Sequence, residues 1–422
     1  MNSRQRVQAA LRHQAPDRPP LDLGSTNVTG ISASTYAKLR RALGLPESRV
    51  RVVEPFMMLA DMDDDVRDAV GIDTVGLRLP KTFFGFVNEN WQPWTMFDGT
   101  EVLVAGQFNV REAANGDMLL HPKGDASAPP SGRMPQGGYY FDVIVRQQPI
   151  DWDHLDPDEW VKEMYAVYSD EDLRFLQDRA DHLHHTSERA LICSLVGGGF
   201  GDIAVVPGPV LAHPKGIRDP QDWIVAHATH PEYIKGIYER QCEIALENAR
   251  LLWQAVGSKL DVVQVSGTDF GTQDRLFISP DMYRELYKPF HQRVNDWIHR
   301  NTTWKVFLHS CGSVVGIIDD FIDAGVDILN PVQTSAKGMD PRLLKDTYGD
   351  RLVFWGGGVD TQFTLPFGTP DEVYAQARER ISILNRNGGF VFTPVHNVQQ
   401  GVPAANLLAM FSAIKDAIKD AG

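Results

Sequence analysis

The stretch Trp304–Gln333, WKVFLHSCGSVVGIIDDFIDAGVDILNPVQ, decides the expected fold. It contains two short apolar runs, Trp304–Leu308 and Asp327–Leu329, separated by a helical stretch that Gly325 is placed to end. A strand, a helix and a second strand at this spacing are typical of a βαβ unit, in which the two strands lie parallel.

The same alternation continues through the C-terminal two thirds of the chain, and two less clear strand candidates lie nearer the N-terminus. The other apolar runs are Leu21–Leu23, Asp73–Leu77, Ala190–Leu195, Asp261–Val265, Leu352–Trp355 and Phe390–Thr393. With the two runs quoted first, this makes eight strands. The sequence therefore predicts an α/β chain, a single (β/α)8 TIM barrel over residues 1–422.

Residues 81–150 break this rhythm. The segments FDGTEVLVAGQFNV, GDMLL and YYFDVIV alternate apolar and polar residues, and Asp98-Gly99 and Asn115-Gly116 are typical of hairpin turns. We expect an antiparallel β insertion on the barrel. Its aromatic side chains either form a small core of their own, which is the favoured interpretation, or line a substrate lid.

The composition excludes several classes of partner. The 422 residues include 41 basic and 55 acidic side chains, a net charge of −14, whereas nucleic acids and anionic membranes are bound by basic surfaces. We find neither a membrane-spanning apolar run nor a signal-peptide core in MNSRQRVQAALRHQ. Three cysteines do not suggest a disulfide framework, so we expect a cytoplasmic protein with a small-molecule substrate.

In a TIM barrel the active site forms where the strands end, so the residues after each apolar run are the candidates. Six runs deliver polar groups or glycines to the same predicted rim. They are GGG at 197–199, SGTDFGTQ at 266–273, HSCG at 309–312, NPVQ at 330–333, GGGVDTQ at 356–362 and PVHN at 394–397. This convergence predicts one site at the rim.

His309 and Cys311 stand two positions apart at a strand end, where side chains at i and i+2 point to the same face. Imidazole and thiolate together suit zinc, and the alternative is a buried cysteine beside a hydrogen-bonded histidine. His396 ends the last strand, across the barrel mouth from the fifth. It is either a third metal ligand, which leaves a fourth position open, or a group that bonds substrate or backbone.

Two carboxylates also follow predicted strands. Asp269 is interpreted as a general acid or base, or as a group that orients a metal ligand, and the alternative is a turn cap. Asp360 has the same functional and capping interpretations. The glycine runs lack the spacing of nucleotide-binding motifs, so no nucleotide is predicted.

From about residue 260 to 415 the chain resembles the uroporphyrinogen decarboxylase superfamily. The resembling strings are SGTDFGTQDRLFISPDMYRELYKPFHQRV, VFLHSCGSV, GVDILNPVQTSAKGMDPRLLK, GDRLVFWGGGVDTQ and FVFTPVHNVQ, in the family's order. The superfamily includes metal-free porphyrinogen decarboxylases and zinc methyltransferases. The porphyrin enzymes carry an N-terminal Arg-Gln-Ala-Gly-Arg segment, and this chain has LDLGSTNVTG at 21–30 instead. The resemblance therefore implies the corrinoid- and zinc-dependent methyltransferase, or O-demethylase, branch.

This resemblance implies that zinc is held by His309 and Cys311, with His396 where the coenzyme M methyltransferases have a cysteine. Replacing sulfur by nitrogen makes the site harder and more Lewis-acidic, which suits the oxygen of a methyl ether. We therefore expect a methyltransferase that removes a methyl group from a small substrate, such as a methoxylated aromatic compound. The acceptor is expected to be a corrinoid-type carrier.

The remaining roles follow from the same resemblance. Gln333, Asn397 and Asp360 are expected to bind substrate, and Asp269 to orient a ligand or move a proton. No Asp-x-His-x-x-Gly motif is present, so the corrinoid would be carried by a separate protein, and the family favours a homodimer. Two alternatives stay open: a metal-free lyase acting on a carboxylated substrate, and a non-catalytic barrel that binds a tetrapyrrole or corrinoid.

Overall fold

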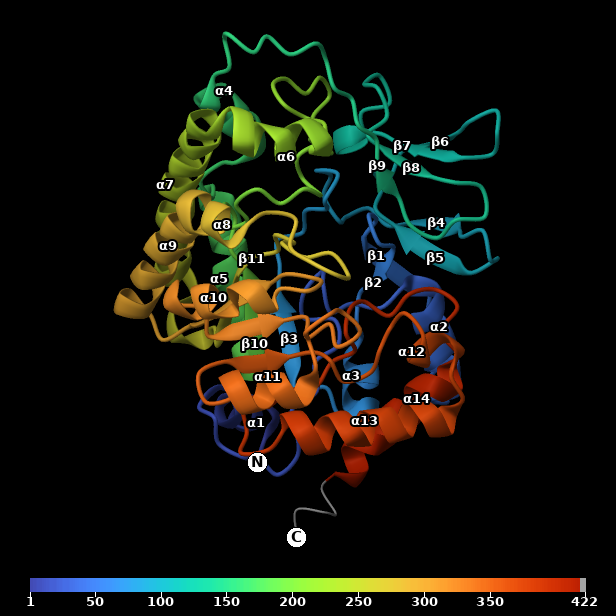
Figure 1. Cartoon of the computed structure of the whole chain (residues 1–422). Coiled ribbons are helices and arrows are strands. Elements are labelled where there is room, and N and C mark those ends of the chain that lie inside the picture. The colour runs from blue at the N-terminus through green and yellow to red at the C-terminus, as the bar shows by residue number, and fades with distance from the viewer. Residues whose placement is uncertain (418–422) are drawn as a thin grey trace.

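The structure, a computed structural model, describes residues 1–417. Its centre is a parallel sheet of seven strands in the order β15-β14-β13-β12-β11-β10-β3 (Figure 1). The strands are β3 (Thr74–Leu77), β10 (Ala190–Ser194), β11 (Val262–Ser266), β12 (Lys305–His309), β13 (Ile328–Asn330), β14 (Val353–Trp355) and β15 (Phe390–Val391). Each overlaps one of the predicted runs, so the α/β class and the parallel sheet are confirmed.

The sheet curls, and the segment around Leu21 lies between its two edges. Leu21 forms a parallel bridge with Phe392, just beyond β15, and its carbonyl accepts the N–H of Asp73, just before β3, at 2.8 Å. The predicted first strand is reduced to this bridge, because Pro20 has no N–H to donate and the chain then turns. The arrangement is consistent with a TIM-like barrel.

Helices surround the curled sheet, many of them on its outer face (Figure 1). They are α1 (Ser3–Leu11), α2 (Ala33–Ala42), α3 (Asp64–Val70), α4 (Pro157–Met164), α5 (Asp170–Thr186), α6 (Pro220–Thr229), α7 (Pro231–Val256), α8 (Pro280–Leu286), α9 (Lys288–Asn301), α10 (Ile318–Asp323), α11 (Pro341–Tyr348), α12 (Thr364–Phe367), α13 (Pro370–Leu384) and α14 (Ala404–Asp416). Capping side chains set their starts: Ser279 accepts the Met282 N–H at the head of α8. Among residues 1–417, no helix is long and apolar enough to cross a membrane.

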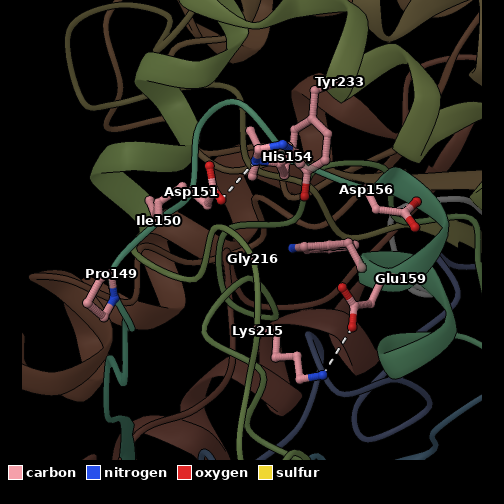
Figure 2. A pocket seen from close by; sticks show the side chains of 11 residues that line it. Pro149, Ile150, Asp151, His154, Asp156, Glu159, Lys215, Gly216 and Tyr233 are labelled. Carbon is pink, nitrogen blue, oxygen red and sulfur yellow. Dashed lines mark hydrogen bonds and ion pairs between the residues drawn. The ribbon is translucent and has the colours of Figure 1, made fainter.

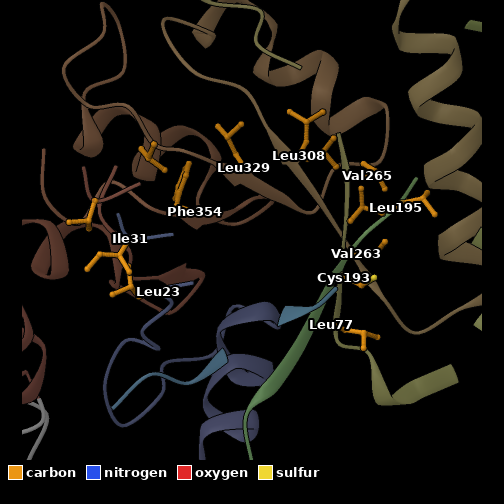
Figure 3. Packing of buried hydrophobic residues seen from close by; sticks show 14 of the residues in the cluster. Leu23, Ile31, Leu77, Cys193, Leu195, Val263, Val265, Leu308, Leu329 and Phe354 are labelled. Carbon is orange, nitrogen blue, oxygen red and sulfur yellow. The ribbon is translucent and has the colours of Figure 1, made fainter. Parts of the chain in front are cut away.

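The two faces of the sheet bury different residues, because alternate side chains of a strand point to opposite sides. The outward ones pack beneath the helices and include Cys193, Val263, Leu308, Leu329 and Phe354 (Figure 3). Each fully buried aliphatic side chain of this kind stabilises the fold by about 1.5–3 kcal/mol.

The inward face changes character along the strands. At the N-terminal ends, inward side chains such as Ile192, Val262 and Phe307 pack against Val7 and Leu11 of α1, which lies across the bottom of the barrel. Two positions further along the same strands, the inward residues are polar: Ser194, Gln264 and His309. The barrel interior is therefore dry at one end and polar at the end where a site is expected.

The segment 81–150 contains two small antiparallel hairpins. One is formed by β4 (Gln92–Thr95) and β5 (Glu101–Val104), and the other begins with β6 (Val110–Glu112) and β7 (Met118–Leu120). Each hairpin belongs to a four-stranded sheet. The first sheet also contains β1 (Val50–Glu54) and β2 (Leu59–Ala60), and the second also contains β8 (Gly132–Met134) and β9 (Asp142–Val143).

Both hairpins turn at the predicted Asp-Gly and Asn-Gly sites. However, β5 also pairs in parallel with β1, which precedes the expected segment. The first hairpin is thus not self-contained, and an insertion bounded at 81–150 stays a prediction. Phe84, Phe108 and Phe141 pack edge to face here, with Phe141 contacting both of the others at 5.7–6.4 Å between ring centroids.

Candidate metal and substrate site

His309 is the last residue of β12 and is only 3% exposed. Its Nδ1 lies 2.5 Å from Oδ1 of Asn330, and the amide nitrogen of Asn330 donates to the carbonyl of Trp355 at 2.7 Å. Because that second bond fixes the amide nitrogen, Asn330 presents an acceptor to the imidazole. Nδ1 therefore carries the proton, and Nε2 keeps its lone pair.

Two more donor atoms lie near this lone pair. Sγ of Cys311 is 3.3 Å from Nε2 of His309, and the rings of His309 and His396 stand 5.3 Å apart at 71°. The ligand atoms of the three residues lie within 4.8 Å of one another. Tetrahedral zinc, with bonds of about 2.0 Å to nitrogen and about 2.3 Å to sulfur, needs this kind of spacing. The donor set fits zinc.

Burial sets the protonation of these groups. It lowers the pKa of His309, and it lowers the pKa of His396 to about 4, with the neighbouring His309 adding to the effect. Both imidazoles are therefore neutral at pH 7, the form that binds metals. Burial, together with the Asp269 carboxylate, raises the pKa of the Cys311 thiol well above its ordinary value. The thiolate forms only where a cation compensates its charge.

Asp269 follows β11 and reaches the same centre. Its Oδ1 accepts the backbone N–H of Cys311 at 2.7 Å and lies 3.7 Å from Nε2 of His309. The side chain is 35% exposed, so the carboxylate both holds the HSCG turn and remains accessible. This geometry accommodates the orienting and proton-moving interpretations as well as the capping one.

The loop after β11 presses against the HSCG turn. Gly312 has φ +87°, and a Cβ there would come within 2.4 Å of the Gly271 backbone. The N–H of Phe270 donates to Oγ of Ser310 at 2.9 Å. Two loops that approach this closely need glycine at the contact, and the result fixes Asp269 relative to Cys311.

The three expected substrate-binding residues have different surroundings. Oε1 of Gln333 accepts the Gly312 N–H at 2.7 Å, so it supports the HSCG turn. Asn397 is 1% exposed, and its amide bonds the Gly30 N–H at 2.5 Å and the Asn27 carbonyl at 2.9 Å. Its amide is thus engaged in holding the loop 24–30 beside His396, and substrate binding by Gln333 and Asn397 stays a prediction.

Asp360 shows capping geometry. Its Oδ1 accepts the backbone N–H of Gln362 at 2.8 Å, and its own N–H donates to Gln376 at 2.8 Å. These bonds shape the turn after β14. A contact of Asp360 with substrate stays a prediction.

Two rim residues were not singled out from the sequence. Asp202 lies in the loop after β10, and burial, with a contribution from Asp269, raises its pKa to about 7. Arg78 directly follows β3. Both follow a predicted strand, so the rule that points to strand ends would have included them.

A separate surface pocket lies beside α4, away from these residues (Figure 2). An ion pair between Lys215 and Glu159 at 3.1 Å lies on its wall, and Trp160 and Tyr233 also contribute. None of the predicted site residues lines it. The chemistry is therefore expected at the strand ends, not in this pocket.

Comparison with known proteins supports the expected superfamily. The family model described as uroporphyrinogen decarboxylase (URO-D) matches residues 215–417. Among solved structures, a methyltransferase from Methanosarcina mazei is 15% identical, with 99% of both chains covered and a TM-score of 0.52, which shows a shared fold. A galacturonate dehydratase variant from a Geobacillus species is 9% identical over 60% of this chain and 65% of that chain, and its TM-score of 0.25 supports no argument. No curated protein matches the chain in sequence.

Proposed function

Because residues 215–417 match the uroporphyrinogen decarboxylase family model, we propose that this protein is a zinc-dependent methyltransferase of that superfamily. It removes a methyl group from a small substrate, such as a methoxylated aromatic compound, and passes it to a corrinoid-type carrier on a separate protein. The supporting observation is the donor set of His309, Cys311 and His396, whose ligand atoms lie within 4.8 Å. The fold shared with a protein named as a methyltransferase also supports it. A cytoplasmic homodimer is part of the same proposal.

In this proposal, His309, Cys311 and His396 hold the zinc and leave a fourth position for substrate. The bound ion would supply a Lewis acid that polarises the atom losing the methyl group. The protein prepares the site in advance. Asn330 fixes the imidazole tautomer of His309, and Gln333 and Asp269 hold the turn that carries Cys311.

The proposed transfer breaks the bond between the substrate oxygen and the methyl carbon. The oxygen keeps the electron pair of that bond, and the carrier supplies the pair for its new bond to carbon. The oxygen then needs a proton. Asp269 is placed to move it, because Oδ1 is held by the Cys311 N–H while no hydrogen bond to Oδ2 is found among residues 1–417.

A methyl-transfer assay tests this function. The zinc-loaded chain is incubated with reduced cobalamin and a panel of methoxylated aromatic compounds, and methylcobalamin is followed by its absorbance. We expect product with the wild type and with Cys242→Ser, which changes a buried cysteine on α7, and at least about a hundredfold less with Cys311→Ser. Methyl transfer that survives both chelation and Cys311→Ser would reject the role of zinc. Release of CO2 from a carboxylated substrate, without methylcobalamin and unaffected by chelation, would instead favour the metal-free lyase. Tight cobalamin binding without product would favour the non-catalytic barrel.

A further inference from the structure

Arg78 is a rim residue for which the proposed zinc chemistry has no task. It follows β3, two positions after Gly76. A Cβ at Gly76 would lie 2.3 Å from the Ser25 carbonyl oxygen and 2.9 Å from Nε of Arg78. Glycine at position 76 therefore leaves the space across which the arginine side chain folds.

The guanidinium of Arg78 has few partners. It donates from Nη2 to the Gly24 carbonyl at 2.5 Å, and no carboxylate in residues 1–417 forms an ion pair with it. Its five N–H donors are thus largely unused. None of its nitrogens is sealed from solvent without a partner, so the free donors face accessible space.

Other arginines that this fold buries are paired. Arg6 contacts Asp73 at 2.7 Å, Arg40 contacts Asp65 at 2.8 Å, and Arg218 contacts Glu163 at 2.9 Å. Removing a guanidinium from water is costly unless an anion accompanies it. Arg78 is half-buried without such an anion. Arg146 is also half-buried without one, but it donates to three backbone carbonyls, whereas Arg78 donates to one.

The carboxylates whose charge acts on Arg78 already have other partners. Asp61, which contributes most, pairs with Arg51 at 3.2 Å. Asp22 accepts the Thr74 hydroxyl at 2.6 Å and the Trp355 indole N–H at 2.9 Å. Glu54 accepts the backbone N–H groups of Phe56 and Phe83, both at 3.1 Å. Burial raises the pKa of Glu54 to about 7, so this carboxyl is only partly ionised at neutral pH.

Arg78 is also connected to the candidate metal site. Its partner Gly24 begins the loop 24–30, which Asn397 holds at Asn27 and Gly30. Asn397 directly follows His396. On the neighbouring strand, Ser194 points inward and is exposed to solvent, so the barrel interior beside β3 is open.

We propose that Arg78 binds an oxyanion carried by the substrate, with a carboxylate as the leading example, and so selects anionic over neutral substrates. The planar fork of the guanidinium matches the two oxygens of such a group. The inference deepens the proposed function, on which it rests for the nature of the rest of the substrate. It narrows the substrate class to small anions, such as methoxylated aromatic carboxylates.

Calorimetric binding to the zinc-loaded full chain tests this inference without turnover. The probes are 3-methoxybenzoate and its neutral isostere 3-methoxybenzamide. A charge-assisted pair of this kind is expected to favour the carboxylate by at least about tenfold in Kd. Arg300→Met, which removes an exposed arginine of α9, should keep this preference. Arg78→Met should abolish it, and Arg78→Lys should retain part of it.

Benzoate, phosphate and methanesulfonate extend the test to the smaller anions. If only phosphate binds through Arg78, the anionic group is a phosphate and the carboxylate example is wrong. The inference is overturned if no anion binds or if wild type does not prefer the carboxylate over the amide. It is also overturned if Arg78→Met keeps that preference. Arg78→Gln replaces Arg78→Met should the latter misfold. A chain that prefers the carboxylate through Arg78 but holds no zinc would contradict the proposed function alone.

Discussion

Two pairs of buried histidines occupy different layers of this molecule. His227 and His291 lie in the helical layer, whereas His309 and His396 lie at the strand ends. Burial lowers the pKa of all four. What separates them is how their ring nitrogens are used.

In the helical layer, hydrogen bonds stay within the packing. Nε2 of His291 is buried without a hydrogen-bond partner, but among residues 1–417 no cluster of metal-binding side chains includes it. Nδ1 of His227 lies 2.8 Å from the Trp223 carbonyl, and Nε2 lies 3.0 Å from the Tyr238 hydroxyl and 2.6 Å from that of Tyr287. At the rim, Nε2 of His309 faces the thiol of Cys311 instead. A lowered histidine pKa therefore does not by itself indicate a metal site. A free ring-nitrogen lone pair beside a cysteine thiol does.

Exchanging one histidine of each pair for glutamine tests this contrast most strongly. His309→Gln removes a proposed zinc ligand, so it should lose bound zinc and, with it, methyl transfer. His227→Gln disturbs only packing and hydrogen bonds, so it should keep about one zinc per chain. Elemental mass spectrometry of both purified variants measures this. Equal zinc content in the two would erase the proposed distinction.

Asn330 is not a proposed metal ligand, but it hydrogen-bonds to the proposed ligand His309. Asn330→Ala removes the acceptor that fixes the tautomer of His309, so zinc affinity should fall by about 10–100-fold while some binding remains. Competition with a chromogenic chelator gives the affinity. An unchanged affinity would mean that the Asn330 contact does not prepare the imidazole for a metal.

The helical pair should make stability depend on pH. Burial lowers the pKa of His227 to about 4 and of His291 to about 3, from an ordinary value of 6.5. A lowered pKa means that the folded state favours the neutral ring, so this stability is complete above pH 6.5 and is lost as pH falls toward the folded values. Each ring should cost about 2 kcal/mol between pH 6.5 and 5.

Urea unfolding at the two pH values measures this loss, and His227→Gln should reduce it by about 2 kcal/mol. The same acid dependence in wild type and variant would show that His227 is not held neutral by the fold. His309 and His396 are unchanged in this variant, so their share of the acid dependence is the same in both proteins.

The strand ends could be predicted from the sequence because local signals mark them. Short apolar runs, each followed by polar residues, indicated β10 to β15 and brought His309, Cys311, Asp269 and His396 to one rim. The metal donors needed only the i, i+2 rule and the expectation that strands five and eight face each other.

The rest depends on contacts between distant segments. The bond from His309 to Asn330 exists because these two residues pair in the register of β12 and β13, and no local pattern states that register. The pairing of β1 with β5 joins residues about fifty positions apart, which local turn signals do not reveal. The strand-end rule would have included Arg78 as a candidate, but its lack of a carboxylate partner can be known only when all partners are placed.

Metal content of the purified full chain tests the central claim most directly. Wild type, Cys311→Ser and Cys242→Ser are expressed with zinc supplied and analysed by elemental mass spectrometry beside their protein concentrations. We expect about one zinc per chain in wild type and Cys242→Ser, and a loss of zinc in Cys311→Ser. No zinc in wild type, or zinc undiminished in Cys311→Ser, would contradict it.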